Sequence, residues 1–297
     1  MNNFDQLYQS CSLCPHRCGV NRLAGNRGMC QAPSTPKIAQ TMLHQWEEPC
    51  ISGTLGSGTV FFSHCNLKCI YCQNYRISHE GRGRELSVAA LADVFLDLQK
   101  QGAHNINLVS PNPYLPSIAA ALTLAKKDGL SIPVIYNTNG YELPDSLEYL
   151  DGLVDIYLPD LKYFSTTVSA ELSGINDYFE TATVAILAMF KQVGSPRFDQ
   201  AGLLTRGLLI RHLVLPNHHD ESKRVLDWIR QNLPLTIYIS LMAQYFPAYQ
   251  AAENPKINRL LTEAEYDEVV DYCLDLGLEN GFTQEISAAD PKYTPEF

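Results

Sequence analysis

Residues 63–74 read SHCNLKCIYCQN and place Cys65, Cys69 and Cys72 in a C-x3-C-x2-C pattern, directly after the apolar run at residues 59–62. The apolar run predicts a buried strand, so the cysteines should lie on the loop that follows it. Three thiolates this close together can bind three corners of an iron–sulfur cube, whereas a complete cube normally takes four cysteines. One iron would remain open to a substrate or cofactor, which indicates a site of chemistry rather than electron storage alone.

A structural zinc loop is the alternative interpretation of this stretch. A zinc site would need a fourth ligand, and it more often shows paired C-x2-4-C spacing. The strict order and spacing of the three cysteines therefore favour an iron–sulfur cluster.

Length and charge exclude several classes of protein. At 297 residues the chain suits one large α/β domain, or such a domain with a small appendage. Its formal net charge is −10 and it has no run of lysines or arginines, which argues against a nucleic-acid partner. We find neither an export signal near Met1 nor an apolar run that could cross a bilayer. We therefore expect a cytoplasmic protein with no membrane association.

Seven of the nine cysteines fall in two tight clusters within the first 72 residues. Without an export signal, clustered cysteines indicate metal binding rather than disulfides. The first cluster, Cys11, Cys14, Cys18 and Cys30, has proline and glycine residues at its turns. Its four thiolates could converge on a zinc ion or on a second iron–sulfur cluster, and His16 could replace one ligand in either. A set of reduced, buried cysteines is the alternative without metal.

Beyond the cluster loop, apolar strand segments alternate with helical segments. We expect strands at residues 59–62, 106–109, 134–136, 154–158, 208–215 and 235–240, and helices at residues 88–101, 117–127, 143–149, 177–192 and 221–231. Apolar strands separated by helices predict a parallel sheet covered on its faces. Six such units predict an α/β fold, a partial (β/α)6 TIM-like barrel with an irregular cysteine-rich N-terminal extension. Its active site should lie at the carboxyl ends of the strands.

The same pattern divides the chain into three parts. Residues 1–58 are expected to form a cysteine-rich metal-binding extension and a connector, with residues 33–58 as a flexible approach to the first strand. Residues 59–245 form the barrel, and residues 246–297 a C-terminal helix and tail packed on it. A capping box of Thr262 and Glu265 should begin that helix. Cys50 and Cys273 stand outside both clusters and are expected to be ordinary buried residues.

The spacing of Cys65, Cys69 and Cys72, with the aromatic Tyr71 before the third cysteine, resembles the signature of the radical S-adenosylmethionine (SAM) superfamily. The resemblance implies a [4Fe-4S] cluster whose open iron binds the amino and carboxylate groups of SAM. It also implies an oxidoreductase that reductively cleaves SAM and uses the 5′-deoxyadenosyl radical to abstract hydrogen from a substrate. A flavodoxin or ferredoxin as electron donor is implied by the resemblance alone.

The barrel is most similar to the pyruvate formate-lyase activating enzyme, and the whole chain resembles its less characterised relatives with a cysteine-rich amino-terminal extension. The sequence Asn-Thr-Asn-Gly at residues 137–140 follows the third strand, and Asp-Leu-Lys at residues 160–162 follows the fourth. The resemblance implies that these segments help hold a monovalent cation beside the SAM carboxylate. Thr138, Asp160 and the Leu158 carbonyl remain available for it, whereas Asn137 replaces the first acidic ligand, which implies a weaker cation site or none. Lys162 would pair with that carboxylate, because an ion pair is favourable where water is scarce. A surface ion pair between Asp160 and Lys162 is the alternative.

Two other segments complete the expected SAM pocket. The resemblance places Arg211, on the fifth strand, at the SAM ribose, while His212 should point to the opposite face of the strand. After the second strand, many family members carry Gly-Gly-Glu for the SAM amino group, but residues 110–114 of this chain read SPNPY. Ser110 and Asn112 are the candidates there, because they offer acceptors to an ammonium group.

Three functions remain open on this evidence. The first is an enzyme that abstracts hydrogen from a partner protein, with a glycyl radical enzyme that it activates as the specific case. Activating enzymes with extra clusters carry them after the SAM cluster, whereas this chain carries its extra cysteines before it. The second function is the same chemistry on a peptide or small molecule, and the third is a non-enzymatic metal-binding module.

Overall fold

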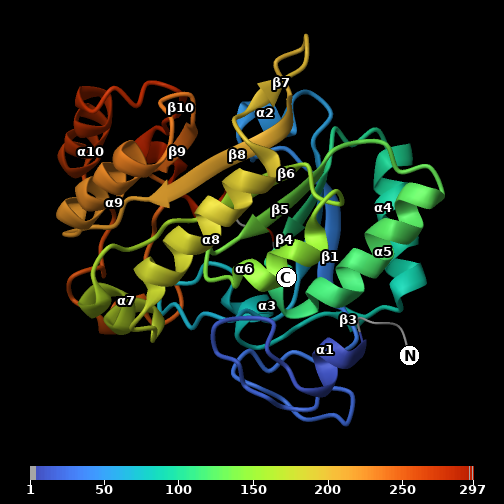
Figure 1. Ribbon diagram of the computed structural model, residues 1–297. Helices are drawn as coiled ribbons and strands as arrows, with labels where there is room; N and C mark the ends of the chain where they lie inside the picture. The colour runs from blue at the N-terminus through green and yellow to red at the C-terminus, as the bar shows by residue number, and fades with distance from the viewer. Residues whose placement is uncertain (1–4, 294, 296) are drawn as a thin grey trace.

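The computed structural model describes residues 5–293, 295 and 297 and has an α/β architecture (Figure 1). Within this part of the chain the strands join one sheet of ten, in the order β10-β9-β8-β6-β5-β4-β2-β1-β3, with β7 paired to β8 off this path. The strands are β1 (Lys37–His44), β2 (Ser57–Phe62), β3 (Arg84–Glu85), β4 (Ile106–Val109), β5 (Val134–Thr138), β6 (Ile156–Pro159), β7 (Arg197–Phe198), β8 (Leu204–Leu213), β9 (Tyr238–Met242) and β10 (Gly281–Phe282).

Six of these strands, β2, β4, β5, β6, β8 and β9, lie side by side and run parallel. They are the six that the sequence predicts, and the predicted α/β partial barrel is confirmed. Since parallel strands end at the same edge of the sheet, the segments that follow them can meet there.

The helices cover the outer face of this sheet. In Figure 1, α4 and α5 lie together at one side and α9 and α10 at the other, with α8 across the middle. The helices are α1 (Asp5–Gln9), α2 (Pro49–Ser52), α3 (Tyr75–Ser78), α4 (Val88–Lys100), α5 (Leu115–Lys127), α6 (Pro144–Leu147), α7 (Thr166–Ser173), α8 (Tyr178–Val193), α9 (His219–Asn232) and α10 (Glu263–Asp275). None of the helices in the described residues is long and apolar enough to cross a lipid bilayer.

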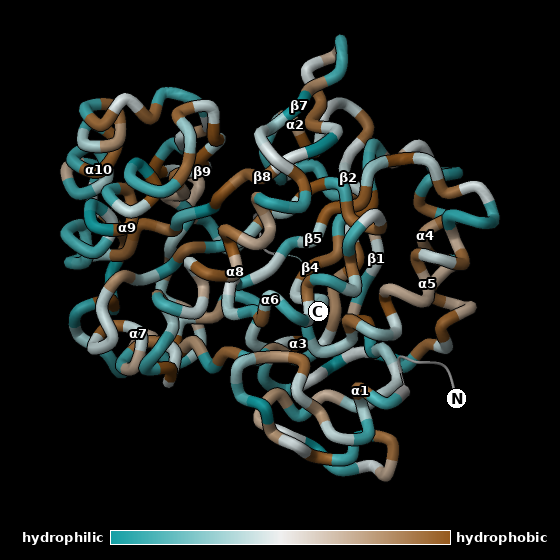
Figure 2. The backbone as a smooth tube through the Cα atoms, in the orientation of Figure 1, coloured by the Kyte–Doolittle hydropathy of each residue, from teal (hydrophilic) through white to brown (hydrophobic). Residues whose placement is uncertain are grey.

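Alternate residues of the parallel strands pack on two different sides. Tyr136 and Ile210 belong to the large core beneath the helices, whereas Ile135 and Leu209 belong to a smaller core inside the curve of the sheet. The backbone colouring of Figure 2 follows this burial, with hydrophobic stretches along β4 and β8. Because side chains on a strand alternate, Arg211 shares the inner face with Leu209.

The interpretation of residues 33–58 as a flexible connector is wrong. Residues 37–44 form β1, which pairs antiparallel with β2 and with β3. The short helix α2 then places Cys50 and Ile51 in the inner core, where they pack with Ile135 and Leu209. This segment therefore forms part of the barrel wall and floor.

The C-terminal part follows the prediction and extends it. Thr262 and Glu265 form the expected capping box, and Cys273 of α10 is buried, as is Cys50 in α2. Beyond α10, β10 pairs parallel with β9. Helix α7 and the short strand β7 are additions that the sequence pattern did not predict.

Candidate active site

The three cysteines of the cluster loop face one cavity of about 610 Å³ at the carboxyl edge of the sheet. The loop follows β2 and ends where α3 begins. The parallel strands β4, β5, β6, β8 and β9 each place a residue in the lining of this cavity, at or near the carboxyl end of the strand. These residues are Val109, Asn137, Asp160, Leu213 and Met242. The structure thus brings the cluster loop together with the strand ends, as the barrel predicts.

Each thiol of the loop has a polar neighbour from another part of the chain or loop. The side-chain amide of Asn139 donates to Cys65 Sγ at 3.2 Å, and the Ser173 hydroxyl donates to Cys69 Sγ at 3.0 Å. Cys72 Sγ lies 3.2 Å from the Ser78 hydroxyl. Hydrogen bonds to sulfur tune the potential of iron–sulfur clusters, so this donor set fits a cluster bound to three thiolates.

Burial controls the protonation of these thiols. It raises the pKa of Cys65 to about 11 and that of Cys72 to about 12. Iron binds thiolates, so cluster binding must release protons from the loop. No group of three or more His, Cys, Asp or Glu side chains in residues 5–293, 295 and 297 is arranged to hold a single metal ion. A cube suits the loop better, because it binds each thiolate through a different iron.

Tyr71 anchors the loop from inside. Its hydroxyl lies 2.5 Å from that of Tyr163, which lies 2.6 Å from the Ser173 hydroxyl, the donor to Cys69. Burial raises the pKa of Tyr71 well above its ordinary value. The neutral phenol therefore lines the cavity and braces the loop through a chain of hydroxyl groups.

An ion pair lies in the wall of the cavity opposite the loop. Lys162 Nζ is 2.5 Å from Asp160 Oδ2, and both side chains are mostly buried, at 15% and 22% exposure. Burial opposes the charged ammonium, but the Asp160 carboxylate raises the pKa of Lys162 well above its ordinary value. The pair lines the cavity with Asn137 and Thr138, so it is not the surface ion pair that the sequence left open.

Tyr178 and Gly140 fix the segment that carries these groups. The Tyr178 hydroxyl lies 2.7 Å from the Asn139 carbonyl and 2.9 Å from the Asp160 carbonyl, and it accepts from the Lys162 amide at 3.1 Å. Gly140 has φ of 81°, and a Cβ at this position would clash with the Asp160 carbonyl oxygen. Glycine is therefore required where the two strand ends approach each other.

Arg211 lies at the floor of the cavity in a buried charge cluster. Its Nε donates to Glu48 Oε1 at 2.8 Å, its Nη2 pairs with Glu48 at 2.5 Å, and Nη2 also pairs with Glu47. Burial opposes ionisation of Glu48, but the Arg211 guanidinium holds the pKa of this carboxyl below its ordinary value. His212 points to the opposite face, where its ring bonds Leu161 and Ser222, as predicted.

Sequence reasoning missed both glutamates, which follow β1 in the segment taken for a connector. Glu47 also accepts a hydrogen bond from Asn107 of β4 at 2.8 Å, so β1, β4 and β8 meet at this point. The acidic pair before Pro49 is the one local signal that could have indicated them.

The segment after β4 differs from the expectation. Ser110 lines the cavity with φ of 55°, a left-handed conformation that favours glycine. Asn112 is buried at 3% exposure, is not part of the lining, and bonds to the Glu142 carboxylate instead. The reason is that residues 112–114 form a 3-10 turn that directs Asn112 and Tyr114 into the protein interior. Ser110 is thus brought to the site, and Asn112 is not.

Glu142 is a further residue that the sequence did not single out. It is completely buried, and it accepts from Asn112, Thr138 and, at 3.4 Å, the Tyr136 hydroxyl. Burial raises its pKa to about 7, although these hydrogen bonds act in the other direction. The carboxyl group positions Thr138 from behind the cavity wall.

Glu142 should make the stability of the protein depend on pH. A folded-state pKa of about 7 against an ordinary value of 4.5 means that the folded chain retains a proton that the unfolded chain releases. Stability should therefore fall by about 3 kcal/mol as pH rises through this window. Relative to the wild type, Glu142→Gln should gain about that amount between pH 4.5 and 7 in urea unfolding followed by circular dichroism. A stability difference that does not change with pH would contradict this assignment.

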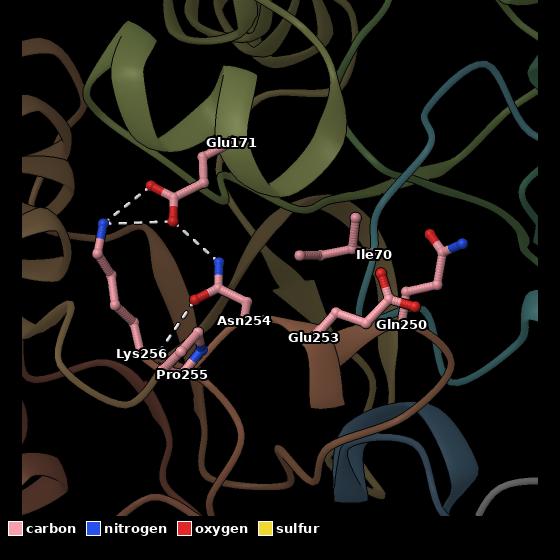
Figure 3. Close-up of a pocket in the computed structure, with 7 residues that line it drawn as sticks. All are labelled: Ile70, Glu171, Gln250, Glu253, Asn254, Pro255 and Lys256. Atoms are coloured by element: carbon pink, nitrogen blue, oxygen red, sulfur yellow. Dashed lines mark hydrogen bonds and ion pairs between the residues drawn. The ribbon is translucent and has the colours of Figure 1, made fainter.

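A second, more open hollow of about 550 Å³ lies on the outer side of the cluster loop (Figure 3). Ile70 of the loop lies on one side of it, and Glu171 of α7 pairs with Lys256 at 3.0 Å on the other. Asn254 donates to the same carboxylate at 2.9 Å. These groups neutralise one another, so the hollow does not compete with the inner cavity as the site of chemistry.

The fold and the site together define a class of protein: a partial-barrel α/β protein in which three cysteines face one cavity at the carboxyl edge of the sheet, an arrangement that fits an iron–sulfur cluster. A family model described as the Radical SAM superfamily matches residues 59–229. The chain belongs to the radical SAM superfamily, and it therefore binds SAM and a [4Fe-4S] cluster.

Several known proteins are similar to this chain. The uncharacterized protein MJ0674 of Methanocaldococcus jannaschii is 31% identical over 283 residues, which cover 91% of this chain and 77% of that protein. The crystal structure of SuiB from Streptococcus suis has a TM-score of 0.52 at 17% identity and covers 81% of this chain and 52% of SuiB. SuiB bound to the precursor peptide SuiA has a TM-score of 0.50 at 17% identity, with 79% and 51% covered. This chain spans about half the length of SuiB, and the likeness shows the fold.

Proposed function

We propose that this radical SAM enzyme abstracts hydrogen from a peptide or protein substrate, and that activation of a glycyl radical enzyme is the narrower case to test. The observation that carries the proposal is the single cavity in which Cys65, Cys69 and Cys72 face the Asp160–Lys162 pair and Arg211. Cys65, Cys69 and Cys72 would hold the cluster, which together with bound SAM would supply 5′-deoxyadenosyl radical chemistry. The remaining work of the chain is to bind and orient SAM and to admit the substrate.

The side chains around the cavity suit the two ends of SAM. Lys162 offers an ammonium group to the SAM carboxylate, near Asn137 and Thr138. Arg211, with the carboxylates of Glu47 and Glu48, offers hydrogen-bond donors and acceptors to ribose hydroxyls. Ser110 lies in the same lining and is the candidate for the SAM amino group.

The residues at the mouth of the cavity support the proposal of a large substrate. Trp46 lines it and is 64% exposed, and residues 282–285 of the C-terminal segment line it as well. Exposed aromatic side chains commonly anchor bound peptides. SuiB, whose structure with a precursor peptide has the same fold, gives independent support for a peptide.

The test is to supply reconstituted enzyme, SAM and dithionite with either the large or the small molecules of a cell extract, separated by ultrafiltration. We expect the large molecules to stimulate 5′-deoxyadenosine formation, with a mass change in one of them. A glycyl radical signal in electron paramagnetic resonance (EPR) would establish the narrower case. Trp46→Ala should reduce the stimulation, whereas Leu274→Ala, exposed on α10, should not. Stimulation by small molecules alone would refute a peptide or protein substrate.

A further inference from the structure

The four N-terminal cysteines lie in one compact unit. The Gly19 amide donates to the Cys11 carbonyl at 2.9 Å, and the Arg17 amide donates to the Cys14 carbonyl at 2.9 Å. Cys14 lies near Cys11 and Cys30, and Cys30 lies near Cys11 and Cys18, close enough for a thiolate at one position to disfavour a thiolate at its neighbour. All four are free thiols. The extension therefore gathers four potential ligands without joining any of them in a disulfide.

A glycine allows two of the cysteine-bearing segments to approach each other. A Cβ at Gly28 would lie 2.8 Å from Cys18 Sγ, and the Met29 amide lies 3.4 Å from the same sulfur as a donor. The segment that leads to Cys30 is thus packed directly on Cys18. The same contact supplies Cys18 with the kind of backbone donor that metal-bound thiolates accept.

Arg22 places a buried positive charge beside these thiols. Its side chain is only 2% exposed, and the guanidinium lies 4.5 Å from the centre of the Tyr8 ring. The guanidinium donates to the Pro33 carbonyl and, at 3.8 Å, to Cys11 Sγ. The Nε atom of Arg22 has no hydrogen-bond partner, and no carboxylate of the described residues forms an ion pair with this side chain. A buried cation is costly unless a negative charge compensates it. The neighbouring thiols can supply that charge as metal-bound thiolates.

The spacing of the thiols favours a cluster over a single ion. Four sulfurs around zinc, each about 2.3 Å from the metal, lie within about 3.8 Å of one another. No three His, Cys, Asp or Glu side chains within the described ranges are grouped in this way. The same holds for Cys65, Cys69 and Cys72, which in this superfamily bind a cube. The four thiols are therefore not gathered as tightly as a zinc ion requires, which favours an iron–sulfur cluster as the occupant.

The extension also contacts the cluster loop itself. His16 lies between Cys14 and Cys18, and its Nε2 is 2.7 Å from the carbonyl of Asn66, the residue after Cys65. Asn139 donates to the Asn66 side chain at 2.8 Å and to Cys65 Sγ at 3.2 Å. Figure 1 shows the extension next to α3, which follows the loop. Contacts through His16, Asn66 and Asn139 thus connect the segment between Cys14 and Cys18 to the Cys65 thiol.

We propose that Cys11, Cys14, Cys18 and Cys30 bind a second iron–sulfur cluster, balanced in charge by Arg22, that passes electrons to the cluster at Cys65, Cys69 and Cys72. In each step a reduced one-electron carrier protein gives one electron to the second cluster, which then gives one electron to the first. No bond forms or breaks, and the carrier is the species oxidised. The inference of a second cluster depends only on the residues of the extension. The inference that this cluster passes electrons to the first depends in addition on the proposed radical SAM function.

The first test of the binding site is the iron and zinc content of three anaerobically reconstituted proteins. Replacing Cys65, Cys69 and Cys72 by alanine should halve the iron, since one of two cubes is lost, and Cys14→Ser/Cys30→Ser should also halve it. The second variant should retain an EPR signal from the first cluster that SAM perturbs, which shows that the barrel is folded. Zinc in place of the remaining iron, or no metal at all, would overturn the proposal.

Arg22→Met provides a second readout, which does not require removal of a cysteine. Loss of a buried positive charge should make the second cluster harder to reduce, so its midpoint should shift to lower potential in an EPR titration. Relay is tested by reduction with flavodoxin, which should fail to reduce the first cluster of Cys14→Ser/Cys30→Ser. An unchanged midpoint potential in Arg22→Met would refute the role of Arg22. Undiminished reduction of the first cluster by flavodoxin in Cys14→Ser/Cys30→Ser would refute the relay, while the proposal that the enzyme cleaves SAM would stand.

Discussion

The variant in which alanine replaces Cys65, Cys69 and Cys72 should form no detectable 5′-deoxyadenosine from SAM. All three thiols face the cavity, and without them no thiolate of the loop would hold the cluster whose open iron binds SAM. Enzymes commonly accelerate their reactions by roughly 10⁶-fold or more, so the loss should reach the background rate. The measurement is chromatography of the nucleoside products after anaerobic reduction by dithionite.

Cys273→Ala is the matched control for this variant. Cys273 is buried in α10, and its thiol contacts the Leu278 carbonyl at 3.5 Å, far from the lining of the cavity. Its replacement should cost only about 1 kcal/mol of stability and should leave SAM cleavage intact. If the variant without the three loop cysteines still made deoxyadenosine, the cluster that cleaves SAM would have to be bound elsewhere.

The barrel could be predicted from sequence because its strands carry strong local signals. Residues 106–109 and 134–136 are mostly apolar runs between helical segments, and alternation along a strand correctly separated Arg211 from His212. The β1 segment has no such signal. It reads KIAQTMLH, and six of its eight residues are only half-buried, because it packs beside β2 near the margin of the sheet.

The missed contacts of the site share another cause, which is their distance along the chain. Glu48 and Arg211 are separated by 163 positions, and Glu142 binds Asn112 across 30 positions. No local period predicts such pairs. The turn after β4 is equally hard to predict from local sequence, because a proline-rich segment could place Asn112 either in the cavity or in the core. In the structure, a hydrogen bond to the buried Glu142 carboxylate holds Asn112 in the core.

Arg211→Met should cause a large loss of stability. The side chains of Glu47 and Glu48 are only 8% and 5% exposed, and this substitution would leave both carboxylates buried without their cation. Breaking a buried ion pair in this way costs about 3–5 kcal/mol. Urea unfolding followed by circular dichroism should show the shift, whereas Arg82→Met, in an exposed pair with Glu80, should change stability by less than about 1 kcal/mol.

The pH dependence of that loss identifies its cause. In the wild type the guanidinium lowers the pKa of Glu48, so this group contributes stability above its ordinary value of 4.5 that is lost as pH falls through the lowered folded pKa. In Arg211→Met, burial without the guanidinium should raise the pKa of Glu48, so stability should instead fall as pH rises above about 4.5. Adding Glu47→Gln and Glu48→Gln to the variant should restore most of the lost stability and remove this slope. A loss that is independent of pH and unrelieved by the glutamines would mean that Arg211 stabilises the barrel by packing, and that the floor of the cavity is not held by charge.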